Sequence, residues 1–141
     1  MAVNIRFNHM ELSVPSGTLT DGFRADLEAF YGDVFGFSFQ PGRMFEQDTH
    51  LMTLPDGPFI LVIEAERPMA APGFDHLGFE MQSRDQVDET RAKVRAWTEK
   101  DARVQLKEYP DGVMDGRLYH AYYVRHLLPI WFDVQYSSPV G

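Results

Sequence analysis

The sequence predicts an α+β fold built from two similar halves, and three observations support this prediction. A motif at residues 7–14 returns at residues 74–81, which is 67 positions later. An amphipathic helical pattern follows each copy of the motif, and three strand-like segments follow each helical pattern. Recurrence of one element order at half the chain length is typical of two copies of one supersecondary unit. We therefore expect a single domain of 141 residues, formed by module 1–70 and module 71–141.

Both copies of the motif are predicted to be strands. They read Phe7-Asn8-His9-Met10 and Phe74-Asp75-His76-Leu77, and apolar residues continue at alternate positions. Successive side chains of a strand point to opposite faces of the sheet. His9 and His76 are therefore expected on the face opposite the apolar row that enters the core.

The helix of the first half is predicted by apolar residues that recur at spacings of three and four. Thr20 or Asp21 is the expected N-cap, and Gly36 is the expected stop. The expected strands lie at 37–39, 47–54 and 59–64, with turns at 40–43 and 55–58. The apolar residues that define the helix are Phe23, Leu27, Phe30, Tyr31 and Val34.

The second half repeats this order. Ser83 and Gln86 form a capping-box signature, which predicts a helix that runs to about Lys100. The other expected elements are strands at 103–109, 118–125 and 130–136 and a turn at 110–112.

Composition narrows the possible functions. The chain has no cysteine, which excludes thiol catalysis, disulfides and thiolate metal ligands. A formal net charge of −8 argues against nucleic-acid binding, which depends on basic surfaces. No apolar run is long enough to span a membrane, and the N-terminus lacks a signal-peptide pattern. We expect a cytoplasmic protein that binds a small molecule, with no nucleic-acid or membrane partner.

The alignment of the two halves places two carboxylates at equivalent positions, in addition to the two histidines. The segment 61–65 aligns with 130–134 at an offset of 69, which places Glu64 and Asp133 at equivalent sites. Two imidazoles and two carboxylates are a suitable ligand set for a borderline divalent metal ion. The alternative is that the histidines bond to neighbouring groups and the carboxylates face water at strand ends. Spacing alone leaves both interpretations open.

The chain resembles the vicinal oxygen chelate superfamily, which includes glyoxalase I, extradiol dioxygenases, fosfomycin-resistance proteins and bleomycin-resistance proteins. The resemblance covers the two histidine motifs, the helix ending at 27–37, and the strands that contain Glu64 and Asp133. It implies two tandem βαβββ modules that form an incomplete barrel with a central cleft. It also implies a homodimer, as is usual for members of this size.

The resemblance further implies that His9, Glu64, His76 and Asp133 bind a divalent metal ion such as Zn, Ni, Fe, Mn or Co. Glu64 or Asp133 would then act as the catalytic base. Asp133 departs from the family pattern, because most metal-dependent members have glutamate on the final strand. Tyr123 resembles the catalytic tyrosine of extradiol dioxygenases, although the histidine expected several residues before it is absent.

Two functions follow as alternatives. The first is a metal-dependent enzyme of the glyoxalase and dioxygenase group, a lyase, isomerase or dioxygenase, acting on a substrate with vicinal oxygens. The second is a metal-free binding protein resembling bleomycin-resistance proteins, which sequesters a cationic or planar compound in an acidic, aromatic groove. His50 and His120 occupy equivalent places on the third strand of each half, and the sequence leaves open whether they support a site or only the fold.

Overall fold

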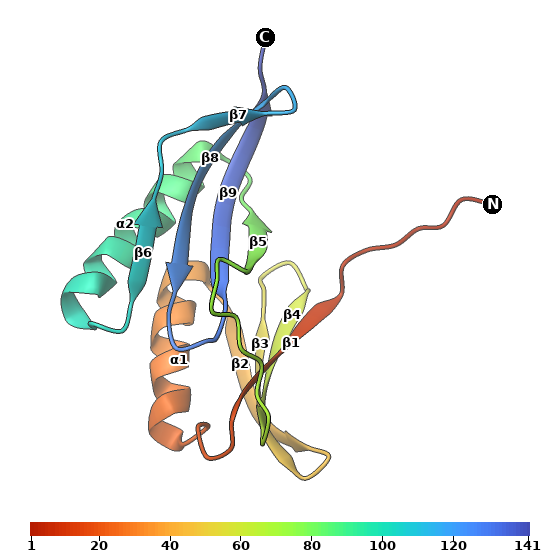
Figure 1. Cartoon of the computed structure of the whole chain (residues 1–141), viewed down its shortest axis with the longest axis vertical. Helices are drawn as coiled ribbons and strands as arrows, with labels where there is room; N and C mark the ends of the chain where they lie inside the picture. The colour runs from red at the N-terminus through yellow and green to blue at the C-terminus, as the bar shows by residue number, and fades with distance from the viewer. The chain divides into compact units, whose positions relative to one another are not determined.

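The first half of the chain forms a four-stranded sheet with one helix. The computed structural model describes all residues, 1–141, and divides into two compact units, Met1–Met69 and Ala70–Gly141. In the first unit the sheet order is β1-β4-β3-β2, where β1 is parallel to β4 and the other pairs are antiparallel (Figure 1). The elements are β1 (His9–Pro15), α1 (Asp21–Phe35), β2 (Ser38–Met44), β3 (Gln47–Thr53) and β4 (Phe59–Ala65).

Local signals at both ends explain the limits of α1. The Thr20 side chain accepts a hydrogen bond from the Phe23 amide at 3.2 Å, which satisfies one of the unpaired N–H groups of the first turn. At the other end Gly36 adopts φ 69°, the left-handed conformation that closes many helices. Both predicted ends of this helix are confirmed.

The turn predicted at 40–43 is wrong. Strand β2 continues through Pro41 to Met44, and the chain reverses at Phe45 and Glu46, whose φ angles are 50° and 63°. Pro41 is tolerated because β2 is an edge strand, where a missing N–H need not break the ladder. Two non-glycine residues with positive φ make this a costly hairpin turn, which is why the sequence did not indicate it.

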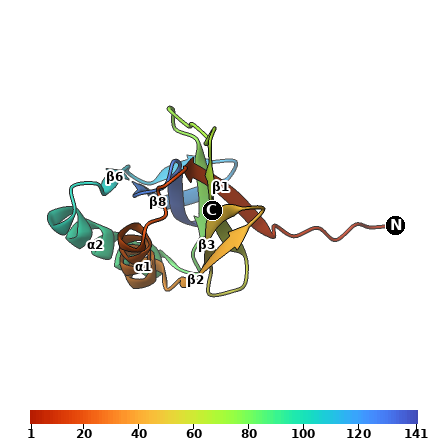
Figure 2. The ribbon, with the colours of Figure 1, turned by 90° about the horizontal axis from the view of Figure 1, so that it is seen from below.

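The second unit repeats the arrangement with five strands and one helix. Its sheet order is β5-β9-β8-β6, and β7 also pairs with β8. Figure 2 shows α2 near β6 and β8. The helix α2 contacts β6, β8 and β9. The elements are β5 (His76–Glu80), α2 (Arg84–Lys100), β6 (Gln105–Glu108), β7 (Gly112–Met114), β8 (Arg117–Arg125) and β9 (Trp131–Pro139).

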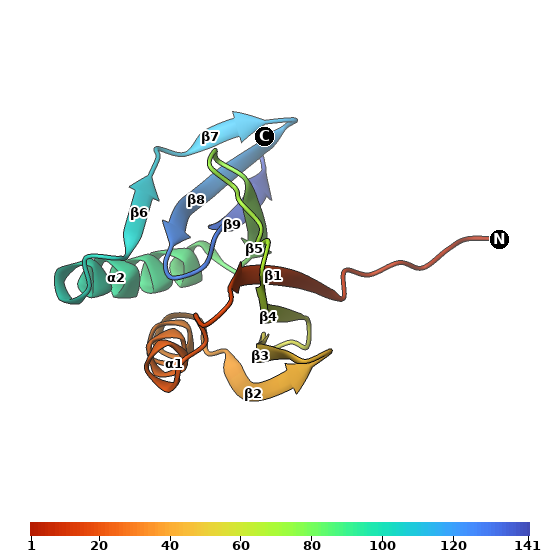
Figure 3. The same ribbon diagram turned by 60° about the horizontal axis from the view of Figure 1, so that its bottom comes forward.

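The predicted turn at 110–112 does not reverse the chain. Strands β6 and β7 run one after the other along β8, and both pair with it in the antiparallel sense (Figure 3). The reversal comes at Asp115 and Gly116, with φ of 50° and 73°. The strand that follows α2 is thus broken into two pieces, and the order remains one strand, one helix and three strand positions.

In the first unit the buried residues of β1, Leu12 and Val14, lie on the face opposite the exposed His9. In the second unit Val87 and Val94 of α2 are buried together with alternate residues of β8, whereas β9 is buried on both faces from Trp131 to Val134. Complete burial of one such aliphatic or aromatic side chain contributes roughly 1.5–3 kcal/mol. The predicted α+β class and the predicted side of each histidine are confirmed. Neither helix combines the length and the apolar character required to cross a membrane.

Candidate functional site

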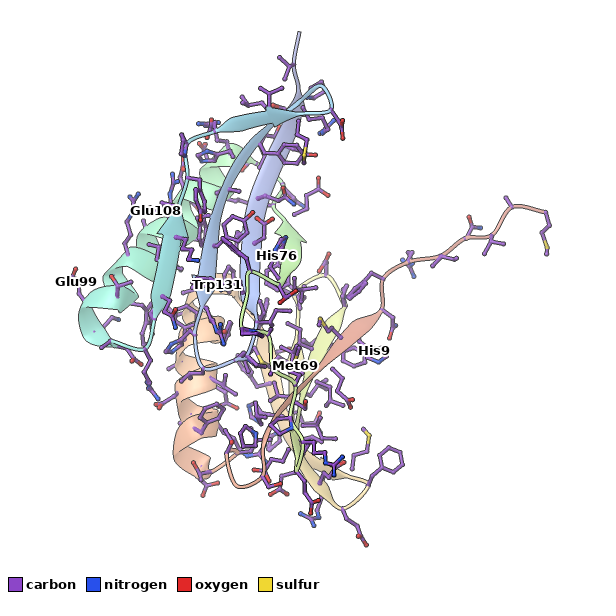
Figure 4. All side chains as sticks on the ribbon, viewed as in Figure 1. His9, Met69, His76, Glu99, Glu108 and Trp131 are labelled. Carbon is purple, nitrogen blue, oxygen red and sulfur yellow. The ribbon has the colours of Figure 1, made fainter.

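The second unit brings one predicted histidine and one predicted carboxylate together. Strand β5 is parallel to β9, and the register pairs His76 with Trp131 and Gly78 with Asp133. Paired residues of adjacent strands share a face, so the side chains of His76 and Asp133 project to the same side of the sheet. His76 Nε2 lies 3.7 Å from Asp133 Oδ2. Figure 4 shows His76 and Trp131 on their neighbouring strands.

A backbone carbonyl orients the His76 ring. His76 Nδ1 lies 2.9 Å from the carbonyl oxygen of Phe74. A carbonyl oxygen only accepts hydrogen bonds, so Nδ1 carries the proton and donates it, which leaves the lone pair on Nε2. Metal-binding histidines are commonly fixed in this way by a bond from the other ring nitrogen.

The carboxylate beside this ring is buried and incompletely bonded. The Asp133 side chain is 10% exposed, and its Oδ1 atom is buried without a hydrogen-bond partner in the chain. Burial raises the pKa of Asp133, while the neighbouring His76 and a hydrogen bond from Tyr123 oppose that rise. An unpartnered buried oxygen is costly unless a proton, a ligand or a metal ion satisfies it. One imidazole nitrogen and one such oxygen therefore fit a divalent metal ion as part of its ligand set.

Tyr123, which the sequence predicted as a catalytic residue, lies beside this pair. It pairs with Asp133 in the β8–β9 register, and its ring centre lies 5.5 Å from that of His76, edge to face. Burial raises the pKa of Tyr123, and the negative charge of Asp133 raises it further. The hydroxyl therefore stays protonated near neutral pH and can donate a hydrogen bond.

The predicted equivalence of Glu64 and Asp133 is wrong. Glu64 pairs with Val14, while His9 pairs with Phe59 at the other end of β1. The five-residue separation is ~16 Å along the strand, and because five is odd the side chains face opposite sides of the sheet. Glu64 Oε2 instead accepts a hydrogen bond from the Leu19 amide at 2.8 Å. Glu64 therefore anchors the loop before α1 and does not share a site with His9 inside the first unit.

Strand register explains why the two residues are not equivalent. Glu64 and Asp133 are 69 positions apart in the sequence. The residues that pair with the two histidines, Phe59 and Trp131, are 72 positions apart. The residue that corresponds to Asp133 is therefore Leu61. His9 itself is exposed, stacks on Phe59 with a centroid distance of 4.7 Å, and has Nδ1 2.5 Å from Asn8 Oδ1.

No group of three or more His, Asp or Glu side chains is arranged as a metal site in the structure. Among the four predicted ligands, His76 and Asp133 are the pair that lies together. Of the four predicted ligands, His9 and Glu64 belong to the first unit, and His76 and Asp133 to the second.

His50 is buried between the side chains of α1. Its Nδ1 lies 2.8 Å from Arg24 Nη1, and its Nε2 lies 3.2 Å from Glu28 Oε1. Burial lowers the pKa of His50, and the positive charge of Arg24 lowers it further, against the opposing effect of Glu28. The ring is therefore neutral, with Nδ1 accepting from Arg24. This geometry assigns His50 to holding α1 on β3.

His120 occupies the corresponding place in the second unit. Its Nδ1 and Nε2 each lie 2.7 Å from a carboxylate oxygen, of Asp111 and Asp88 respectively. The hydrogen bond with His120 is the largest cause that lowers the pKa of both carboxyls. Asp88 belongs to α2, so this ring ties the helix to β8 and to the segment before β7.

Sequence reasoning missed an aromatic pocket beside the His76 and Asp133 pair. It has a volume of about 340 Å³ and is lined by Phe74, Tyr109, Pro110, Gly112, Tyr119, Ala121 and Tyr123. Lys107 was also missed, although its ammonium lies 4.2 Å from the Phe74 ring centre and 4.6 Å from that of Trp131. The alternation of Tyr119, Ala121 and Tyr123 on one strand face was the available signal.

The architecture of the two units is the one found in glyoxalase, bleomycin-resistance and dioxygenase domains and in fosfomycin-resistance proteins, as solved structures of the same fold show. No protein-family model and no curated protein sequence matches this chain. The predicted resemblance to the vicinal oxygen chelate superfamily is confirmed at the level of the fold.

Three solved structures illustrate the similarity. One, from Bacillus anthracis and described as a glyoxalase family protein, has a TM-score of 0.66 and 14% identity, covering 98% of this chain and 100% of that one. A glyoxylase/bleomycin resistance protein/dioxygenase domain from Frankia sp. EAN1pec has a TM-score of 0.64 and 15% identity, over 97% and 94% of the two chains. The fosfomycin resistance protein FosX from Listeria monocytogenes, solved with Mn(II) and sulfate, has a TM-score of 0.63 and 15% identity, over 98% and 95%.

Proposed function

We propose that this protein is a metal-dependent enzyme that acts on a small molecule with two adjacent oxygens, and that His76 and Asp133 hold the metal ion. The observation that carries the proposal is the geometry of this pair, with Nε2 and Oδ2 3.7 Å apart and the other imidazole nitrogen tied to a carbonyl. A structure of the same fold was solved with Mn(II), which supports a divalent ion of that kind.

The chain's own residues supply binding, orientation and a proton. The Phe74 carbonyl holds the His76 ring with Nε2 available, and Asp133 offers Oδ1, a buried oxygen without a hydrogen-bond partner. When bound, a divalent ion would polarise the substrate oxygens as a Lewis acid. Tyr123 lies next to both ligands, and its protonated hydroxyl can donate to an oxygen on which negative charge develops.

Metal titration of the purified chain tests this proposal. The wild type should bind close to one equivalent of Mn²⁺ or Zn²⁺ by calorimetry, and His76→Ala and Asp133→Ala should each weaken binding at least tenfold. Glu64→Gln is the matched control, because Glu64 bonds to the Leu19 amide and should leave metal binding unchanged. Equal metal affinity in wild type and Asp133→Ala would refute the proposed ligand pair.

The aromatic pocket and the acidic composition favour a second candidate function. A pocket of about 340 Å³ lined by tyrosines would suit a metal-free protein that sequesters a planar compound. The same metal titration separates the two candidates, because a metal-free sequestering protein would show no binding of one equivalent of Mn²⁺ or Zn²⁺.

A further inference from the structure

The aromatic pocket of the second unit is formed largely by one face of β8. Tyr119, Ala121 and Tyr123 alternate along this strand and therefore project to one side. The small side chain of Ala121 leaves a recess between the two tyrosines. At the edge, Gly112 pairs with Tyr119, and a Cβ added there would meet no atom within 4 Å. The recess is thus open and flanked by flat rings.

Further rings extend this surface toward the proposed metal ligands. Phe74 lies 4.7 Å from Tyr123 and 6.2 Å from His76, both edge to face. Tyr109 lies 5.7 Å from Tyr123, also edge to face. Edge-to-face and offset arrangements are favourable for aromatic rings, so an additional planar ring can join such a cluster at low cost.

A single exposed ammonium borders the cluster. Lys107 pairs with Tyr123 across β6 and β8, and its Nζ lies over the rings of Phe74 and Trp131. It forms no ion pair with a carboxylate in the structure. The chain as a whole has a net charge of −8 and repels anions. The ammonium of Lys107 can therefore attract a negatively charged group specifically to this pocket.

We propose that this pocket binds a planar aromatic ligand that carries an anionic group such as a carboxylate. The ring would occupy the recess at Ala121 between the tyrosines, and the anionic group would face Lys107. This inference rests on the proposed function, since Phe74 and Tyr123 border both the pocket and the His76 and Asp133 pair, and it identifies the substrate class of that site.

Three probes separate the role of the ring from the role of the charge. They are 2-naphthoate, its neutral amide 2-naphthamide, and the saturated acid decahydronaphthalene-2-carboxylate, each titrated calorimetrically into the full chain. The titrations use metal-free protein first and metal-loaded protein second. We expect 2-naphthoate to bind the metal-free protein at least fivefold more tightly than either of the other two, a difference typical of one favourable charge contact or one ring contact.

Two variants locate the binding. Lys107→Met keeps the chain length and removes the charge, so it should reduce the preference for naphthoate over naphthamide from about fivefold to none. Ala121→Leu fills the recess and should weaken both ligands at least tenfold. Lys100→Met is the matched control, because Lys100 also lies over an indole ring, 4.2 Å from the Trp97 centre, but at the end of α2.

The outcomes also distinguish this inference from the proposed function. Equal binding of naphthoate and naphthamide to the wild type, an unchanged preference in Lys107→Met, or unchanged affinity in Ala121→Leu with a native thermal melt would each overturn it. Loss of metal binding in Asp133→Ala together with any of these results would leave the metal proposal standing and remove only the ligand class. Naphthoate binding to metal-free protein, abolished by Ala121→Leu, supports the ligand class even where no metal binds.

Discussion

The two units carry the same histidine motif on equivalent strands, β1 and β5, but different residues lie next to the histidine in each unit. In the second unit the neighbouring strand places Asp133 beside His76, with Nε2 and Oδ2 3.7 Å apart. In the first unit the corresponding residue is Leu61, and His9 stacks on Phe59. Repetition of a fold therefore did not repeat the ligand pair. In each unit the histidine pairs with a residue of the last strand, and the residue two positions further along that strand decides whether a carboxylate lies beside the histidine. This residue is Leu61 in the first unit and Asp133 in the second.

The buried histidines of the two units differ in a similar way. His50 lies between one cation and one carboxylate, whereas His120 lies between two carboxylates. An imidazole whose two nitrogens both face carboxylate oxygens is satisfied on both sides when it donates from each. The same helix-to-sheet connection is thus made through one cation and one carboxylate in the first unit and through two carboxylates in the second.

Removal of these rings should give the largest effects. His50→Ala should destabilise the protein by about 3 kcal/mol, because it opens a cavity and removes one of the acceptors of Arg24, which keeps the Leu19 and Thr49 carbonyls. His120→Ala should cost about 2 kcal/mol, since its carboxylate partners are partly exposed and water can replace the ring. Chemical denaturation of both variants measures the difference. A larger loss of unfolding free energy in His120→Ala than in His50→Ala would contradict the expected difference between the two units.

A substitution at Leu61 can make the first unit resemble the second. Leu61→Asp places a carboxylate at the position that Asp133 holds relative to its histidine. In an Asp133→Ala background, we expect this change to restore metal affinity at least tenfold, at a cost of about 1–2 kcal/mol in stability for the lost apolar burial. Calorimetric titration of the single and double variants checks it, with Leu61→Asn as control. If Leu61→Asp and Leu61→Asn give the same metal affinity, the carboxylate does not account for the difference in metal binding between the two units.

The pH dependence of stability should be the smallest effect. The pH range in which stability is lost should differ between the two units. The pKa of His50 is lowered in the folded state, so the unfolded chain takes up the proton first, and stability falls as the pH drops below about 6.5. The pKa values of Asp88 and Asp111 are lowered, so their contribution is present above about 3.8 and is lost as the pH falls through the folded values.

Thermal melts from pH 7 to pH 3 measure this difference. The His50→Gln variant should lose the part of the decline that begins near pH 6.5. The Asp88→Asn variant should change only the most acidic part of the curve. A decline near pH 6.5 that persists unchanged in His50→Gln would exclude His50 as its source.

The sequence by itself determined the elements and their order. The N-caps Thr20 and Ser83 and the stop at Gly36 depend on local backbone hydrogen bonds, and these require particular residues within one turn. Alternation within each strand correctly placed His9 and His76 opposite the apolar row, because the period of two is a property of a single strand. The α+β class followed from these local signals.

Only the tertiary structure decided which residues meet across strands. A period of two does not specify the register between neighbouring strands, so Glu64 was matched to Asp133 when Leu61 holds that place. The aromatic pocket and Lys107 likewise depend on β6, β7 and β8 pairing along one edge, which the misplaced turn at 110–112 concealed. Both histidines of the repeated motif, His9 and His76, were predicted as metal ligands. Strand pairing in the second unit places a carboxylate, that of Asp133, beside His76.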